Sequence, residues 1–182
     1  MIRWLGWLLA GIFLGGIVHL STVLLLPELA TRDAYARLLP LTETNRVALL
    51  PQPSPDGAAL PFMDPAFATA ICRYDLSGGP LKVRAQVTQA YTSVTFYTRR
   101  AIAFYAINDR SVGGRMIELD LMTSEQRSLV PEDEDVTAAD RLIVESPTPT
   151  GLMVLRALAP EPGAMPIVRG ILSTAQCTPS EQ

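Results

Sequence analysis

Histidine, lysine and cysteine are scarce in this chain of 182 residues. The single histidine is His19, the single lysine is Lys82, and the two cysteines are Cys72 and Cys177. Because His19 lies in a long apolar run near the N-terminus, the rest of the chain has no Ser-His-Asp or Cys-His nucleophile system and no ordinary histidine zinc site. The sequence also lacks a Gly-x-Ser-x-Gly elbow, a Walker loop and a dinucleotide fingerprint. We therefore assign no catalytic, cofactor-binding or metal-binding residue from the sequence.

The chain also lacks an excess of positive charge. Its formal net charge is −3 and its isoelectric point is near 5.2, whereas a nucleic-acid-binding domain usually carries a basic stripe. We expect no nucleic acid partner. The one charge cluster, Glu132–Asp135, offers the oxygen ligands that Ca²⁺ prefers but lacks the alternating spacing of a calcium loop. A solvated acidic loop is the simpler interpretation.

Charged residues are missing from the run Trp4–Leu26 as well. As a helix this run would be roughly 34 Å long, enough to cross a hydrocarbon core of about 30 Å. A cleaved signal peptide usually has an apolar core of about 7–15 residues followed by a small-x-small site. Here the first Ala-x-Ala after the run begins at Ala34, beyond several charged residues. We predict a transmembrane anchor over residues 1–27, with a cleaved signal peptide as the alternative.

The cysteines bear on which side of the membrane the rest of the chain occupies. Basic residues flank the apolar run on both sides, with Arg3 before it and Arg32 and Arg37 after it, so the positive-inside rule does not decide. Two cysteines of one domain usually form a disulfide in an oxidising compartment and stay reduced in the cytosol. We predict a bridge between Cys72 and Cys177, and a soluble domain on the periplasmic side of the inner membrane.

Residues 28–65 are rich in proline. Proline fixes φ and removes a backbone donor, so this segment is predicted to be an extended connector. Its apolar stretches, residues 47–50 and 60–63, favour a connector that wraps over the domain rather than one that only spaces it from the membrane.

From residue 66 the hydrophobic pattern changes to a period of two, which predicts a β-rich domain over residues 66–182. We predict about seven or eight strands in an antiparallel β-sandwich-like arrangement. The main segments with this pattern are 81–87, 94–96, 101–107, 116–122, 141–146 and 152–159. The run 101–107 is apolar on both faces, so we place it at the centre of a sheet. Glu118 and Asp120 should point outward.

Two short helices are also predicted. Thr123 and Gln126 have the spacing of a capping box, so a helix should begin there and run to Leu129. Near the C-terminus, apolar residues recur at helical spacing behind a proline, which predicts an amphipathic helix; they are Ile167, Ile171, Leu172 and Ala175 behind Pro166. Cys177 should follow the last turn of this helix.

Two stretches carry a family resemblance: residues 73–80 (RYDLSGGP) and residues 144–151 (VESPTPTG), with aromatic strands and the turn 108–110 between them. Together they resemble a bacterial domain of unknown function, family 1254, in its short membrane-anchored form. The resemblance covers roughly residues 66–178 and supplies no catalytic residues. In longer members a second uncharacterised domain follows, so the resemblance implies a companion domain on a second, separately encoded membrane-anchored protein.

Two functions of different classes remain open. The first is a non-catalytic envelope module that binds a partner protein or an envelope ligand. The second is a hydrolase-like enzyme that works through carboxylates. The turn formed by Asn108, Asp109 and Arg110 is the candidate ligand or partner loop. The scarcity of histidine favours the module, whereas a pocket holding Asp109 beside a second acid would favour the enzyme.

Overall fold

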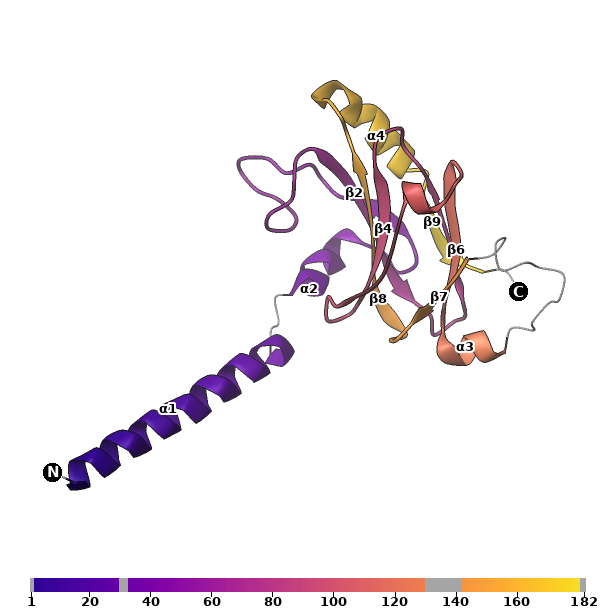
Figure 1. Cartoon of the computed structure of the whole chain (residues 1–182). Helices are drawn as coiled ribbons and strands as arrows, with labels where there is room; N and C mark the ends of the chain where they lie inside the picture. Colours follow the sequence, from indigo (N-terminus) through magenta and orange to yellow (C-terminus); the bar gives the residue numbers. More distant parts are fainter. Residues whose placement is uncertain (1, 30–32, 130–141, 181–182) are drawn as a thin grey trace. The chain divides into compact units, whose positions relative to one another are not determined.

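A computed structural model of the chain describes residues 2–29, 33–129 and 142–180 (Figure 1). The chain divides into two compact units, residues 1–33 and residues 34–182. The first unit contains helix α1, Ile2–Leu29. Within it, Arg3–Leu26 has a mean hydropathy of 2.2 and is long and apolar enough to cross a membrane. A signal sequence would have the same properties, so α1 is compatible with either role.

The second unit is mainly β and is built on two sheets, which confirms the predicted fold class (Figure 1). The first sheet has five strands in the order β1-β2-β8-β4-β5, and every neighbouring pair is antiparallel. Its strands in this order are β1 (Val47–Leu49), β2 (Phe67–Asp75), β8 (Thr150–Leu158), β4 (Thr92–Thr98) and β5 (Ala103–Asn108).

The second sheet has four strands in the order β7-β6-β3-β9. They are β7 (Leu142–Ser146), β6 (Met116–Thr123), β3 (Leu81–Gln86) and β9 (Gln176–Pro179). The pair β6 and β7 is parallel, and the other two pairs are antiparallel. The described residues thus form nine strands rather than seven or eight. The two short strands β1 and β9, of three and four residues, are too short to show an alternating pattern.

The main hydrophobic core lies between the two sheets. In β3, Leu81, Val83 and Ala85 are buried. In β4, Val94 and Phe96 are buried, and alternation puts Thr95, which lies between them, on the other face. This is the period of two that a half-buried strand imposes, and both sheets contribute their inner faces to one core.

The outer face of the five-stranded sheet is partly covered by residues 34–65, which we call the N-terminal strap. The strap contains α2 (Ala34–Leu38), the 3₁₀ turn Leu39–Leu41 and β1. A second buried cluster forms here, where strap residues pack on outward side chains of the sheet; its members are Leu38, Leu50, Ile71 and Leu152. The strap is thereby part of the domain's packing.

Helix α4 holds the middle of the strap. The Arg169 guanidinium donates to the Leu50 carbonyl oxygen at 2.9 Å, and the Gln52 amide lies 3.0 Å from Met165 Sδ. Both partners belong to α4, Met165–Leu172. These two contacts join segments more than 110 residues apart in the sequence.

The capping box is confirmed at the start of α3, Ser124–Ser128. The Gln126 backbone amide donates to Thr123 Oγ1 at 3.2 Å, and the Thr123 amide donates to Gln126 Oε1 at 3.0 Å. These reciprocal bonds satisfy two donors that a helix start would leave unpaired. Sequence spacing alone predicts this local structure correctly.

The C-terminal helix forms as predicted, but its buried face differs. Val168 and Leu172 are buried, whereas Ile167 is 69% exposed. The helix has only eight residues, so one pair four positions apart fills its contact with the sheets. After α4 the chain turns into β9, which places Cys177 on a strand and corrects the prediction that it directly follows the helix.

Two predictions about strand environment are wrong. Most of the apolar run 101–107 lies in β5, at an edge of the five-stranded sheet and not at its centre, because among the described strands only β4 pairs with it. Ala103 and Ala106 are exposed there. Asp120 is only 4% exposed, although alternation correctly puts it on the outer face. It lies in a central strand, in register with Lys82 on one side and Ile143 on the other, so neighbouring strands flank it.

Candidate functional site

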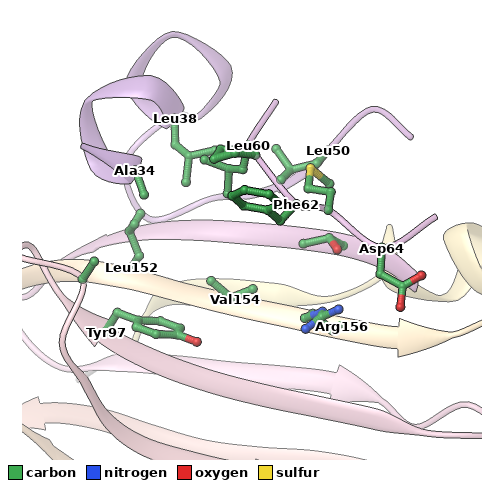
Figure 2. Close-up of a pocket in the computed structure, with 14 residues that line it drawn as sticks. Ala34, Leu38, Leu50, Leu60, Phe62, Asp64, Tyr97, Leu152, Val154 and Arg156 are labelled. Atoms are coloured by element: carbon green, nitrogen blue, oxygen red, sulfur yellow. The ribbon is translucent and has the colours of Figure 1, made fainter. Parts of the chain in front are cut away.

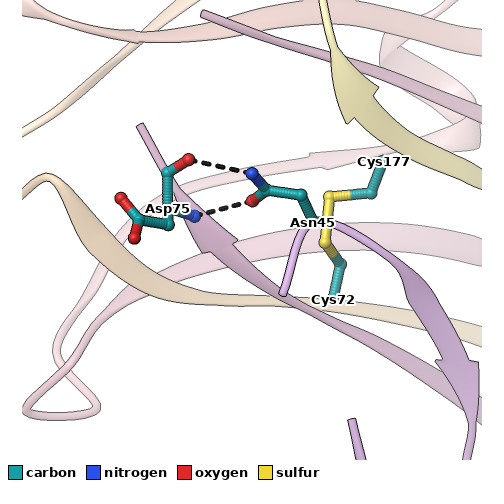
Figure 3. The surroundings of a disulfide bond; sticks show 4 residues. All are labelled: Asn45, Cys72, Asp75 and Cys177. Atoms are coloured by element: carbon teal, nitrogen blue, oxygen red, sulfur yellow. Dashed lines mark hydrogen bonds between the residues drawn. A yellow bond between two sulfur atoms is a disulfide. The ribbon is translucent and has the colours of Figure 1, made fainter. Parts of the chain in front are cut away.

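The predicted disulfide is present and joins the two sheets. Cys72 in β2 and Cys177 in β9 are bonded, with their Cα atoms 6.5 Å apart (Figure 3). Both side chains are buried, at 0% and 1% exposure. The bridge closes a loop with a sequence separation of 105 residues. It is therefore a structural cross-link through the core and not an accessible redox pair.

Asn45 fastens the strap beside this bridge (Figure 3). Its side-chain amide donates to the Asp75 carbonyl oxygen at 3.0 Å and accepts from the Asp75 amide at 2.7 Å. Its own backbone amide donates to the Arg73 carbonyl oxygen at 2.8 Å. Asn45 has a φ of 57°, in the left-handed region that asparagine tolerates better than most residues. The carboxylate of Asp75 is engaged with Ser77, whose side-chain and backbone hydrogen bonds lower the pKa of Asp75.

A buried polar corner lies at one end of the sandwich around Tyr74. The Tyr74 hydroxyl lies 3.0 Å from Ser146 Oγ and donates toward the Tyr97 carbonyl oxygen at 3.2 Å. Ser146 donates in turn to the Thr148 carbonyl oxygen at 2.6 Å. Burial raises the pKa of the Tyr74 phenol above its ordinary value, which keeps the hydroxyl protonated. Because Tyr74 and Ser146 are 0% and 4% exposed, this corner is structural and not a nucleophile site.

The predicted ligand loop is used to build its own turn. Asn108 Oδ1 accepts from the backbone amides of Arg110 and Ser111 and from the Ser111 hydroxyl, at 3.1–3.2 Å. Asp109 Oδ1 accepts from the Thr92 amide at 3.2 Å. These contacts cap the 3₁₀ turn Asp109–Ser111 after β5. The structure brings Asn108, Asp109 and Arg110 together on one turn, with the first two engaged by neighbouring backbone.

Lys82 lies on the polar outer face of the four-stranded sheet, as the alternating pattern of residues 81–87 requires. Its Nζ is 3.3 Å from Glu118 Oε1, and the Arg84 guanidinium is 2.8 Å from the same oxygen. The hydrogen bond from Arg84, helped by Lys82, lowers the pKa of Glu118. These side chains are more than 40% exposed, so this is a solvated ion-pair cluster of small energetic weight.

The remaining sequence candidates are the acidic residues and His19. Within the described ranges, no group of three or more His, Cys, Asp or Glu side chains is arranged to hold a metal ion. The acidic run Glu132–Asp135 lies outside the described residues. His19 lies in α1, where its side chain is exposed.

The second unit has a pocket between the strap and the outer face of the five-stranded sheet (Figure 2). Its volume is about 260 Å³. The floor comes from the central strand β8, through Leu152, Val154 and Arg156, and from Tyr97 of β4. The walls are strap residues, mostly apolar, and include Ala34, Leu38, Leu50, Leu60, Phe62 and Met63.

Few polar groups enter this pocket. Those in the lining are Asp64, Thr69, Tyr97 and Arg156. Asp64 Oδ1 accepts from the Ala66 amide at 2.9 Å, so that carboxylate is engaged in a turn. The Arg156 guanidinium lies 4.3 Å from the centre of the Phe67 ring. An apolar cavity with one engaged acid is suited to binding an apolar group and does not present a carboxylate pair for hydrolysis.

Two loops at the pocket contain residues in the left-handed backbone region. Phe62 in the strap and Ala101 in the turn before β5 both have a φ of 59°. Both line the pocket. This conformation is costly for a bulky residue such as phenylalanine. The Phe62 side chain nevertheless has 103% relative exposure, so no packing in the folded domain offsets the cost.

Comparison with known proteins identifies the family. The profile described as "Protein of unknown function (DUF1254)" matches residues 44–179, which is most of the chain. The chain belongs to the DUF1254 family. The match confirms the resemblance carried by residues 73–80 and 144–151. In this DUF1254 domain the two stretches converge at the polar corner, where Tyr74 contacts Ser146 and the Leu76 amide donates to the Pro149 carbonyl oxygen at 2.8 Å.

Two solved structures show similarity to this chain at low sequence identity. The VPA0106 protein from Vibrio parahaemolyticus matches with a TM-score of 0.56 and 11% identity, over 79% of this chain and 33% of that chain. A putative uncharacterized protein from Burkholderia cenocepacia matches with a TM-score of 0.44 and 13% identity, over 77% and 43% respectively. The DUF1254 chain thus spans about a third of the length of VPA0106. No curated protein matches it.

The pocket is the feature that sequence reasoning missed. Its only signal was the pair of apolar stretches 47–50 and 60–63, which indicated that the strap packs on the domain. Leu152 and Val154 lie on the face of β8 opposite the core. The alternating pattern of a strand does not show that this second face borders a cavity.

Proposed function

We propose that this DUF1254 protein is a non-catalytic binding module, held at the periplasmic face of the inner membrane by α1 and paired with a companion chain. The observation that carries the proposal is β5. This strand is apolar on both faces, as a central strand is, yet it lies at the edge of its sheet. An apolar edge strand is a template for pairing with another chain.

The environment of β5 supports pairing. Its segment 103–108 contains no charged residue or proline, the devices that commonly protect a sheet edge. Ala103 and Ala106 are exposed, so a partner strand would meet no bulky side chain at these positions. Main-chain hydrogen bonds to an added strand would supply the affinity.

Helix α1 supports the proposed anchor, and the disulfide supports the proposed compartment. Helix α1 is long enough to span a bilayer. The buried disulfide between Cys72 and Cys177 suits an oxidising compartment. The hydrolase hypothesis gains no comparable support, because Asp109 is bonded to the Thr92 amide and does not line the pocket.

Affinity capture of the full-length protein, solubilised from its native membrane, tests the proposal. We expect a stoichiometric partner that carries its own membrane-spanning segment, seen also as a larger species in blue-native electrophoresis. Ala106→Lys, which adds a charge to the edge, should weaken the complex about tenfold or more. Thr178→Lys, at an exposed position of edge strand β9, is the matched control and should leave it intact. A protein that migrates only as a monomer at native expression would contradict the pairing.

A further inference from the structure

We propose that the pocket beneath the N-terminal strap binds an acyl chain of a membrane lipid. This inference rests on the membrane anchoring in the proposed function and is independent of the companion chain. It assigns a ligand class to the apolar pocket, whose floor is Leu152 and Val154 and whose walls are strap residues.

The size and lining of the pocket select the ligand. Its volume of about 260 Å³ is below the range of about 300–1,000 Å³ for pockets of drug-sized ligands. A single slender chain therefore fits better than a bulky ring system. Leu38, Leu50, Leu60 and Met63 surround it with aliphatic groups and offer little hydrogen bonding. An apolar chain without polar substituents matches this lining.

The short link between α1 and Ala34 keeps the pocket close to the membrane. Ala34 lines the pocket and follows Leu29, the last residue of α1, by five residues. Five residues span at most about 18 Å when fully extended. With α1 in a bilayer, this short tether keeps the wall of the pocket within reach of the membrane surface, whatever the arrangement of the two units.

The strap, which forms the walls of the pocket, carries exposed apolar side chains. Phe62 is fully exposed and its backbone is held in the left-handed region. Leu39 and Leu41, directly after α2, are 41% and 43% exposed. Aromatic and leucine side chains insert favourably at the boundary between headgroups and acyl chains. Contact with lipid would explain why Phe62 keeps a costly backbone conformation and leaves its side chain unpacked.

The charge around the rim matches a bilayer with anionic lipids. Arg156 lines the pocket, and the Arg99 guanidinium lies 5.4 Å from the ring centre of Tyr35 in α2. The one acid in the lining, Asp64, has its carboxylate engaged in a turn. Anionic headgroups attract such arginines while the acyl chain enters the pocket.

Photo-cross-linking of the full chain tests the inference. The protein is reconstituted into vesicles of phosphatidylethanolamine and phosphatidylglycerol with a trace of phospholipid carrying a diazirine near the end of one acyl chain. After irradiation, adducts are mapped by mass spectrometry. We expect adducts on α1, which report the anchor, and separate adducts on the pocket residues 60–63, Leu152, Val154 and Arg156.

Val154→Phe fills the floor of the pocket and should abolish the pocket adducts while those on α1 remain. Leu158→Phe is the matched control, on the same strand and face but outside the lining, and should change neither set. Phe62→Ser provides a second test that cannot unfold the domain through lost packing, since Phe62 is fully exposed; it should reduce the pocket adducts at an unchanged melting temperature.

If the wild type shows adducts on α1 but none on the pocket residues, the acyl-chain site is overturned while the anchor stands. Pocket adducts that persist in both Val154→Phe and Phe62→Ser would also overturn it. No labelling of α1 would overturn the anchor, and the acyl-chain inference with it.

Discussion

At the scale of single residues, the polar corner around Tyr74 depends on the absence of one side chain. Gly151 in β8 is in register with Tyr74 on one side and Thr98 on the other. A Cβ added at Gly151 would overlap the Tyr97 carbonyl oxygen and the hydroxyl end of the Tyr74 ring. Glycine is therefore required here by close approach and not by backbone angle.

We predict that Gly151→Ala destabilises the domain by about 2 kcal/mol, the middle of the range for overpacking a core. The measurement is the free energy of unfolding from a denaturant titration. Gly170→Ala is the control, because Gly170 lies in α4 with open space around its Cα. That change should stabilise by about 0.5–1 kcal/mol through helix propensity. If Gly151→Ala unfolds at the wild-type midpoint, the close contact described here is wrong.

Residue environments were predictable from sequence where one strand alternates cleanly. Cys72 and Tyr74 share the core face of β2, as their spacing of two requires. Asp120 and Ile167 were not predictable, because their burial depends on neighbours that a one-dimensional pattern omits. Strands on both sides flank the carboxylate of Asp120, and the short contact surface of α4 leaves Ile167 in solvent.

At the scale of elements, the disulfide cross-links the two sheets at an edge strand. Strand β9 has four residues and, among the described strands, pairs only with β3, and the bridge from Cys177 ties it to β2 of the opposite sheet. The chain-entropy treatment gives about 4.7 kcal/mol for a closed loop of about 100 residues, an upper figure because measured gains are often smaller. This is a large share of the stability of an ordinary domain.

We therefore predict that Cys72→Ala and Cys177→Ala each lower the melting temperature markedly. The double variant should be no less stable than either single variant, since one bond is lost in every case. Thermal unfolding of the wild type with and without reductant gives the matching comparison. Equal melting temperatures for the wild type and the double variant would contradict a structural role for the bridge.

Elements with a clear local pattern were predictable, and the two shortest strands, β1 and β9, were not. The capping box and the strands β3, β4 and β6 follow from local spacing. The position of β5 could not be predicted, because an apolar strand is central in an isolated domain but can lie at an edge where a partner covers it. The disagreement between pattern and position at β5 is thus expected of an interaction site.

At the scale of the whole molecule, the pocket arises from segments far apart in the sequence. Its strap wall ends at Asp64, and its floor begins at Thr69 and includes Leu152, Val154 and Arg156. No local pattern encodes such a meeting of segments, so sequence could indicate only that the strap packs on the domain. Binding at this pocket and pairing at β5 would use two different surfaces of one anchored module.

The most direct test of the central claim is the intact mass of the protein extracted from native membranes and alkylated without reduction. We predict a mass that includes residues 2–29 and carries no alkyl group on Cys72 or Cys177, because α1 stays attached and the bridge is closed outside the cytosol. A mass that lacks α1 would show a cleaved signal peptide, and two alkylated cysteines would show reduced thiols. Either result would contradict an anchored domain in an oxidising compartment.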